Sequence, residues 1–320
     1  SYLPQKFARK VIGTHNVDHG SGVYCNNSIN VLLEMLGVPA TTNSIAEPHQ
    51  SEAIIVDGID LGRQLPTVGG WVLRAKLGGA RLIVIDSRRH RVAESADLFL
   101  QIRPGTEVML YGAMAKVILD RGLANSGFIK RHCHDYQEFL EAVRQYDLLT
   151  AAAYCGVPPE LIESAARTYA TARTGSLLYS TGIENRHRDS IRAIVNLALL
   201  TGNLGRPGAG LYALTEQNNL QGVCDMGMLP DRLPGYAAVA DPAGRERLEQ
   251  LWHCRLPTQT GLGTRTLLGD PALTPLRALW LCRYDPVSTA VFSEAAKSLD
   301  KLELVVVRSE EHTSELQSRQ

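Results

Sequence analysis

The chain has 320 residues, of which 44% are hydrophobic and 21% charged, and its 33 basic side chains balance 33 acidic ones. This length allows two or three domains with cores of their own. A net charge of zero gives no electrostatic attraction to nucleic acid or to an anionic membrane, so we exclude nucleic acid as a partner. No apolar run approaches the roughly 20 residues that cross a bilayer, and we expect no transmembrane segment.

Six cysteines are spread along the chain without C-x-x-C spacing: Cys25, Cys133, Cys155, Cys224, Cys254 and Cys282. That scatter indicates neither a disulfide framework nor a zinc ribbon, and we interpret the cysteines as reduced thiols. Cys155, Cys254 and Cys282 belong to no cluster with the spacing of metal ligands, and we predict buried structural thiols.

Both ends of the chain indicate a piece of a longer protein. Ser1 is not an initiating methionine, and the segment after it reads as interior sequence without the regions of a signal peptide. From about Arg308 a polar tract without apolar periodicity resembles a translated sequencing adapter. We therefore expect residues 308–320 to be an artefactual tail.

Short apolar runs rich in β-branched residues predict strands over 53–56, 82–85 and 98–102, and the stretch 68–77 suits a helix. Strands that alternate with helices predict a parallel sheet of the α/β class. Two of the strands lead into Asp57-Gly58 and Asp86-Ser87-Arg88. Because ligands of such folds bind at the carboxyl ends of strands, these loops are the first candidate site.

Further along, apolar spacing predicts helices over 109–120, 135–144 and 158–171, a strand over 176–181 and a helix around 191–199. The strand leads into Gly182-Ile183-Glu184, and the last helix stops at Thr201-Gly202-Asn203. After Gly205, glycine, proline, asparagine and glutamine crowd together as far as Gly235. So long a polar segment predicts a functional loop.

Two motif matches are better explained without chemistry. The run 208–213 fits G-x-G-x-x-A, but a helix and Pro207 precede it where a strand is needed, so we discount a nicotinamide dinucleotide site. His132, Cys133 and His134 are adjacent and cannot easily converge on one tetrahedral ion without a partner at the usual spacing. A basic loop between helices is the better interpretation.

Cys25 lies in a glycine-rich turn immediately before a predicted helix over 28–35. A thiol at a helix N-terminus is more readily a thiolate, which is a soft ligand for a transition metal. On spacing alone, the simpler interpretation as a packed thiol prevails.

Four ordered segments carry a resemblance to a known family: 5–9 (QKFAR), 12–18 (IGTHNVD), 199–205 (LLTGNLG) and 217–227 (QNNLQGVCDMG). They are similar to those of the molybdopterin-dinucleotide oxidoreductases, and of formate dehydrogenase large subunits in particular. The likeness runs from Tyr2 to Val307. It implies two Rossmann-like αβα domains with mainly parallel sheets, within a larger four-domain protein.

The resemblance implies a bis-molybdopterin guanine dinucleotide cofactor whose molybdenum or tungsten is bound by one protein side chain, here Cys25. Residues at strand ends would bind one part of the dinucleotides: Gly58, Asp60, Asp86, Arg88, Gly105, Thr106, Gly182 and Glu184. Others would line the second nucleotide and the pterins: Thr201, Gly202, Asn203, Gln217, Asn219, Gln221, Asp225, Asp285 and Pro286. Carboxylates there suit guanine N–H donors, and backbone amides suit phosphate.

Three departures from the formate dehydrogenase pattern bear on mechanism. The family places its Cys or selenocysteine six residues after the Asp of Asn-Val-Asp, which is Tyr24 here, so Cys25 serves as ligand only if the turn holds one inserted residue. The family's His after the ligand is Asn26, whose amide has no useful pKa. At the position where the family carries its substrate-holding Arg, this chain has Thr215. Glu216 follows it and would repel an anion.

The resemblance also implies the domain organisation and the function. We expect a first α/β domain over 20–217 and a second, discontinuous one over 1–19 plus 218–307. The function implied is two-electron oxidation or reduction of a small substrate, with electrons passing to a 4Fe-4S cluster in an N-terminal segment and to an iron–sulfur or flavin partner. The piece itself would not turn over. Reduced-looking cysteines and the habit of the family point to the cytoplasm.

Two other functions remain open. A structural subunit resembling the large iron–sulfur subunit of respiratory complex I would keep the fold without a working metal site, and Tyr24, Asn26 and Thr215 favour it. A nitrate-type oxyanion reductase needs the cysteine ligand without the formate-type His and Arg. Metal binding by Cys25 separates the structural subunit from both enzymes.

Overall fold

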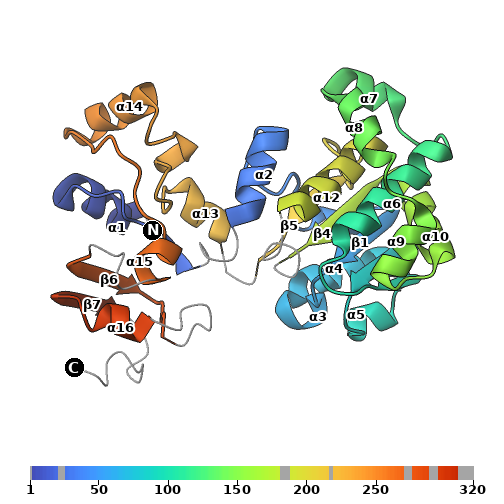
Figure 1. The fold of residues 1–320 in the computed structure, drawn as a ribbon, viewed down its shortest axis with the longest axis horizontal. Helices are drawn as coiled ribbons and strands as arrows, with labels where there is room; N and C mark the ends of the chain where they lie inside the picture. The colour runs from blue at the N-terminus through green and yellow to red at the C-terminus, as the bar shows by residue number, and fades with distance from the viewer. Residues whose placement is uncertain are drawn as a thin grey trace. The chain divides into compact units, whose positions relative to one another are not determined.

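The computed structural model describes residues 2–20, 26–180, 188–215, 219–269, 276–287 and 295–308. The chain divides into two compact units (Figure 1). Tyr24–Asn218 forms one, here called the continuous unit. Ser1–Val23 together with Asn219–Gln320 forms the other, here called the interrupted unit.

The continuous unit is built on a parallel sheet of β1 (Ala53–Asp57), β2 (Arg81–Asp86), β3 (Leu98–Gln101), β4 (Gly175–Tyr179) and β5 (Gly210–Ala213). The strand order is β3-β2-β1-β4-β5. Alternate residues of β1 enter two separate cores, Ala53 and Ile55 on one face and Ile54 and Val56 on the other. Because both faces are covered, these strands are continuous apolar runs in the sequence.

Helices cover both faces of this sheet, which gives an αβα sandwich (Figure 1). The larger core receives side chains from α2 (Asn26–Leu36), α6 (Glu107–Asp120), α7 (Ser126–His132), α8 (Tyr136–Val143), α9 (Leu148–Cys155), α10 (Pro159–Thr171) and α12 (Arg188–Thr201). The smaller core receives them from α3 (Leu61–Gln64), α4 (Pro66–Leu77) and α5 (Arg91–Glu94). The predicted parallel α/β arrangement is therefore confirmed for this unit.

The expectation of one structureless segment over 205–235 is wrong, because the segment contains β5 and α13 (Leu220–Asp225). Its glycines meet a packing demand. A Cβ at Gly210 would lie 2.1 Å from the Asn43 side-chain oxygen, and one at Gly208 would lie 2.9 Å from the Gln50 carbonyl. Close approach of the 42–50 segment to β5 thus accounts for a composition that resembles a loop.

The interrupted unit combines α1 (Tyr2–Phe7), a π-helical turn (Ala8–Ile12), α13, α14 (Pro242–Trp252), α15 (Thr264–Gly269), α16 (Ala295–Leu299) and two strands. Leu233, Val239, Leu248, Trp252 and Leu256 form its main apolar cluster. Strand β6 (Ala278–Cys282) pairs in parallel with β7 (Leu304–Arg308). Arg308, which we assigned to the tail, is the last residue of β7, and 309–320 lie outside the described residues.

The sequence interpretations of single residues have mixed outcomes. Cys155 is buried as expected, whereas Cys254 is partly exposed and Cys282 is exposed, because β6 presents that side chain to solvent. His132 ends α7, and Cys133 follows as its C-cap. The run 208–213 enters β5 itself instead of forming a strand–turn–helix. Within the described ranges, no helix is long and apolar enough to cross a membrane.

Two neighbouring glycines of α4 should respond to alanine in different ways. Gly70 is exposed with open space around its Cβ position, so Gly70→Ala should stabilise the chain by about 0.5–1 kcal/mol through helix propensity. Gly69 is buried, and its Cβ would lie 3.2 Å from the Leu61 carbonyl oxygen, so Gly69→Ala should gain nothing. Urea denaturation of both variants measures the difference, and equal gains would contradict the packing described for Gly69.

Candidate functional site

The carboxyl edge of the five-stranded sheet contains a topological switch point between β1 and β4. From β1 the chain proceeds to β2 and β3 on one side, while β4 and β5 lie on the other. Ligands of open α/β sheets bind in the crevice at such a point. Asp57 and Gly58 come at the end of β1, and Ser180 directly follows β4. In the first turn of α2, Ser28 Oγ donates to the Tyr179 hydroxyl at 3.1 Å, which brings that helix start to the end of β4.

Asp57, the last residue of β1, is a buried carboxyl at this edge. The hydroxyl of Tyr111 on α6 donates to its Oδ2 at 2.5 Å. Burial raises the Asp57 pKa well above its ordinary value; the Tyr111 hydrogen bond opposes this rise, and Glu107 and Asp86 add to it. Burial and the neighbouring carboxyl likewise raise the Tyr111 pKa. Both shifts favour the protonated forms of Asp57 and Tyr111.

The loops after β1 and β2 bring three predicted residues together around His90. The Asp86 Oδ1 accepts from the Arg88 backbone N–H at 2.8 Å, and the Arg88 side chain is exposed. His90 Nε2 lies 3.6 Å from Asp86 Oδ2, and His90 Nδ1 lies 3.7 Å from Asp60 Oδ1. Gly58 takes a φ of 64°, and its N–H donates to the Ile85 carbonyl across to β2. The structure thus places Gly58, Asp60, Asp86 and Arg88 at one site.

Gly105 and Thr106 follow β3 and lead into α6. Gly105 has a φ of 85°, and its N–H donates to Glu107 Oε1 at 3.2 Å. The Thr106 hydroxyl donates to the Arg103 carbonyl at 2.7 Å. Glu107 is buried, and its Oε2 has no hydrogen-bond partner among the described residues. Both predicted residues therefore lie at the carboxyl edge, beside a carboxyl group that the sequence had not indicated.

Thr201, Gly202 and Asn203, which we predicted to line a cofactor, lie apart from the other candidates of the continuous unit. Asn203 Oδ1 accepts from the Gly175 N–H at 2.9 Å, and Gly175 begins β4, so the triplet lies at the amino edge of the sheet. Its polar atoms are occupied, since Thr201 Oγ1 donates to the Leu197 carbonyl at 2.9 Å and Asn203 Nδ2 donates to Thr201 Oγ1 at 3.0 Å. These contacts join the end of α12 to the start of β4.

The remaining described candidates belong to the interrupted unit. Asn219 caps α13, where its Oδ1 accepts from the Gly222 N–H at 3.2 Å. Within α13, Gln221 Nε2 donates to Asp225 Oδ1, one turn further along, at 2.8 Å. Asp285 Oδ1 accepts from the Val287 N–H at 2.9 Å, and Pro286 is buried. Cys25, Gly182, Glu184 and Gln217 lie outside the described residues, as do Tyr24 and Glu216.

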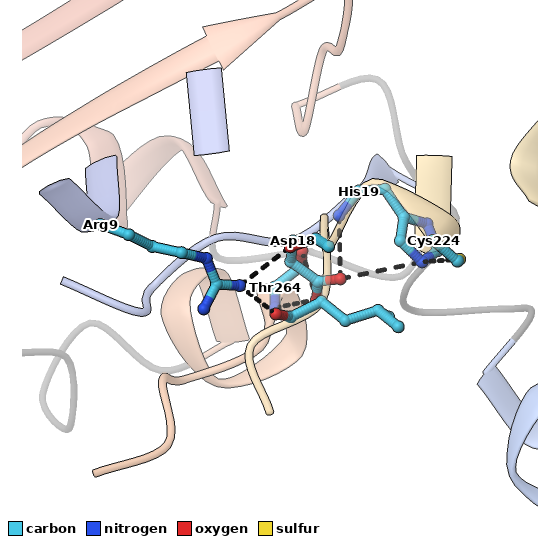
Figure 2. Close-up of polar contacts among 7 residues, drawn as sticks. Arg9, Asp18, His19, Cys224 and Thr264 are labelled. Carbon is cyan, nitrogen blue, oxygen red and sulfur yellow. Dashed lines mark hydrogen bonds and ion pairs between the residues drawn. The ribbon is translucent and has the colours of Figure 1, made fainter. Parts of the chain in front are cut away.

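The 12–18 motif has a structural use within the interrupted unit, as Figure 2 shows. Asp18 Oδ2 accepts from the Thr264 N–H at 2.7 Å and from its hydroxyl at 2.9 Å, so Asp18 caps α15 from 246 residues away. Next to it, His19 Nε2 lies 3.7 Å from Cys224 Sγ on α13. These contacts join the segment before Cys25 to the helix that carries Gln221 and Asp225.

Arg9 is the buried hub of the same unit. Its Nη2 donates to the carbonyls of Gly227 at 2.9 Å, Leu229 at 2.7 Å and Arg232 at 2.8 Å, and its Nη1 contacts His15 Nδ1. Burial lowers the Arg9 pKa to about 10, with Asp231 opposing the shift, so the side chain stays cationic at neutral pH. Sequence analysis used Arg9 only as part of a family motif and missed this role.

Three further residues were missed by sequence analysis. His90 faces Asp86, Tyr111 donates to Asp57, and Glu107 accepts from the Gly105 N–H. None of the three belongs to a motif that we quoted. The spacing of four between Asp86 and His90, across a turn at a strand end, was the available signal for His90. Nothing local indicates that Tyr111 meets Asp57, which lies 54 residues earlier.

A parallel sheet with a topological switch point and helices on both faces defines a doubly wound α/β protein. The fold resembles that of acetylene hydratase from Pelobacter acetylenicus, with a TM-score of 0.71 and 21% identity over 93% of this chain and 44% of that one. The chain belongs to the molybdopterin oxidoreductase family, whose sequence profile matches residues 1–318. The predicted resemblance is thereby confirmed.

Curated relatives include formate dehydrogenases. The chain is 36% identical to formate dehydrogenase H of Escherichia coli over 312 residues, which are 96% of this chain and 44% of that protein. It is 35% identical to the F420-dependent formate dehydrogenase subunit alpha of Methanocaldococcus jannaschii over 311 residues, 96% of this chain and 46% of that one. The chain therefore spans less than half the length of these relatives.

Proposed function

We propose that the chain is the cofactor-binding core of a formate-dehydrogenase-like oxidoreductase that carries molybdenum or tungsten on a bis-molybdopterin guanine dinucleotide. The observation that supports this most is a group of buried polar atoms without hydrogen-bond partners among the described residues, in a chain of this family: Asp60 Oδ1, both His90 ring nitrogens, Glu107 Oε2 and Ser180 Oγ. They lie in the stretches that follow the carboxyl ends of β1, β2, β3 and β4. Buried polar atoms are rarely left unpaired, which favours a polar ligand there.

The residues at this edge fit the nucleotide part of such a cofactor. Asp60 and Asp86 supply carboxylate acceptors for base N–H groups, and the exposed Arg88 guanidinium suits phosphate. Gly58 and Gly105 take positive φ values that let the backbone turn there, and Thr106 follows Gly105. To the same nucleotide we assign Gly182 and Glu184, which lie outside the described residues. For the second nucleotide and the pterins we assign Gln217, Asn219, Gln221, Asp225, Asp285 and Pro286. We further infer domains over 20–217 and over 1–19 plus 218–307.

When bound, the metal centre would supply two-electron redox chemistry, and the protein would orient and tune it. Asp86 and Asp60 would hold the base by accepting hydrogen bonds from its N–H groups, while the raised pKa of Asp57 beside Tyr111 favours an uncharged carboxyl at that edge. Cys25 would bind the metal as thiolate. Electrons would leave through a 4Fe-4S cluster to an iron–sulfur or flavin partner, in the cytoplasm.

One specific observation favours a second function. Tyr24, Asn26 and Thr215 occupy the positions where formate dehydrogenases carry the metal ligand, a proton-handling His and a substrate-binding Arg. A non-catalytic subunit of a redox complex needs none of the three. This alternative predicts a folded protein that holds no metal.

Metal and guanine content of the full-length protein, purified without oxygen, tests the proposal. Stoichiometric molybdenum or tungsten with guanine nucleotide is expected in the wild type. Cys25→Ala should lose the metal or leave it catalytically silent, whereas Cys282→Ala, at an exposed thiol of β6, should change neither. A wild type that is folded and bound to redox subunits but free of metal would overturn the enzyme in favour of the scaffold.

A further inference from the structure

His90 lies between two carboxylates that come from different strand ends. Asp86 ends β2, and Asp60 follows β1 in the neighbouring loop. The two ring nitrogens of His90 lie 3.6 Å from Asp86 Oδ2 and 3.7 Å from Asp60 Oδ1. These distances are within ion-pair range and beyond direct hydrogen bonding. One imidazole ring thus faces one acid with each nitrogen.

The ring is buried and not otherwise occupied. The His90 side chain is 9% exposed, and neither nitrogen has a hydrogen-bond partner among the described residues. The other oxygen of Asp86 already accepts from the Arg88 N–H. His90 is held in place by its backbone, because it is the N-cap of α5, whose Val92 and Ala93 are buried in the smaller core. Its position is therefore set by the fold and not by the carboxylates.

Two carboxylates at a poorly hydrated edge repel one another and rotate apart unless a cation lies between them. The imidazole ring has one nitrogen on each of two sides, which matches one carboxylate on each side. A lysine would supply a positive charge but not one nitrogen facing each carboxylate. An amide would face one carboxylate with its nitrogen and would supply no charge.

We infer that His90 is a positioning residue that holds Asp60 and Asp86 as a paired acceptor for a base with adjacent N–H donors, such as guanine. This inference rests on the proposed function. His90 acts through the two acids and need not touch the base. Its loss should release the acids and weaken retention of the nucleotide, without removing any group that binds it.

The experiment measures guanine nucleotide retained per polypeptide after dialysis of the full-length protein, as GMP released by acid. His90→Gln is expected to lower retention about tenfold, within the range seen when a residue that orients a ligand is replaced. His90→Lys, which keeps the charge, should retain more than His90→Gln. His132→Gln, at an exposed histidine of α7, should match the wild type.

The order of the variants separates positioning from packing, because Gln is closer to His in volume than Lys is. The inference is overturned if His90→Gln retains more nucleotide than His90→Lys, as side-chain volume alone would give, or if His90→Gln retains as much as the wild type. In both cases a wild type that contains guanine nucleotide still supports the proposed function. A wild type without guanine overturns the proposed function, and the inference with it. If His90→Gln folds poorly, its effect on nucleotide retention is measured again in an Asp60→Asn background. There one carboxylate is already lost, so the further loss of retention caused by His90→Gln should be smaller. If the two substitutions lower retention additively, the inference is also overturned.

Discussion

Replacing Arg9 by methionine is expected to lower the free energy of unfolding of the interrupted unit by about 3–5 kcal/mol, the range for breaking a buried hydrogen-bonded charge. Methionine fills a similar volume but donates no hydrogen bond. The carbonyls of Gly227, Leu229 and Arg232 would each lose a donor at 2.7–2.9 Å. An unpaired buried acceptor costs about 1–3 kcal/mol, so the loss is large even if the chain relaxes around one of the three.

Hydrogen exchange locates this effect as well as measuring it. Amides of α13 and α14 should lose protection in Arg9→Met, while those of β1 and β2 in the continuous unit should keep it. Lys10→Met is the matched control: Lys10 donates to the Trp252 carbonyl at 2.7 Å, but its side chain is exposed, so a change within about 0.5 kcal/mol is expected. Equal changes in the free energy of unfolding of the two variants would contradict the conclusion that the buried hydrogen bonds of Arg9 stabilise the interrupted unit.

Replacing Asp57 by asparagine is expected to raise stability increasingly as the pH rises. Burial raises the pKa of the native carboxyl, so the folded chain keeps a proton that the unfolded chain loses above an ordinary pKa of about 3.9. The wild type therefore loses stability from this group as the pH rises, by about 1.4 kcal/mol per pH unit until the native carboxyl itself ionises. Asparagine carries no such proton and can still accept from Tyr111.

Urea denaturation from pH 4 to 8 compares the slopes. The difference between Asp57→Asn and the wild type should grow with pH. Asp97→Asn is the control, because hydrogen bonds from Lys76 and the Leu82 N–H outweigh burial and lower the Asp97 pKa. Its contribution is lost only below the ordinary pKa, so in this window its curve should run parallel to that of the wild type. A parallel curve for Asp57→Asn as well would mean that Asp57 is ionised in the fold.

Prediction from sequence succeeded where one element carries its own pattern. Strands β1, β2 and β4 are buried on both faces, and their apolar runs located them within two residues. Parallel pairing then brought Asp57 and Asp86 to one edge, as expected for strand ends. The helices α7 and α9 went unrecognised, whereas α8, which has the same length as α9, was predicted.

Prediction failed where function depends on contacts between distant segments. Thr201, Gly202 and Asn203 form a conspicuous polar motif, yet they serve the amino edge of the sheet, and no local pattern distinguishes one edge from the other. His90 is a single histidine in a basic stretch until Asp60 is folded against it. Arg9 becomes a buried hub only through carbonyls 218–223 residues away.

The interruption of one unit by the other orders events during synthesis. The segment that carries Arg9 and Asp18 leaves the ribosome before its partners, which lie beyond Asn218 and are made only after the whole of Tyr24–Asn218. The continuous unit can fold as it emerges. The segment before it stays unfolded during that time, because Arg9 has no carbonyl partners and Asp18 has no helix to cap until the later residues are made. Contacts of such high sequence separation form slowly. A nascent chain stalled once the continuous unit has emerged would therefore present that unit folded, preceded by an unfolded segment that a chaperone can bind.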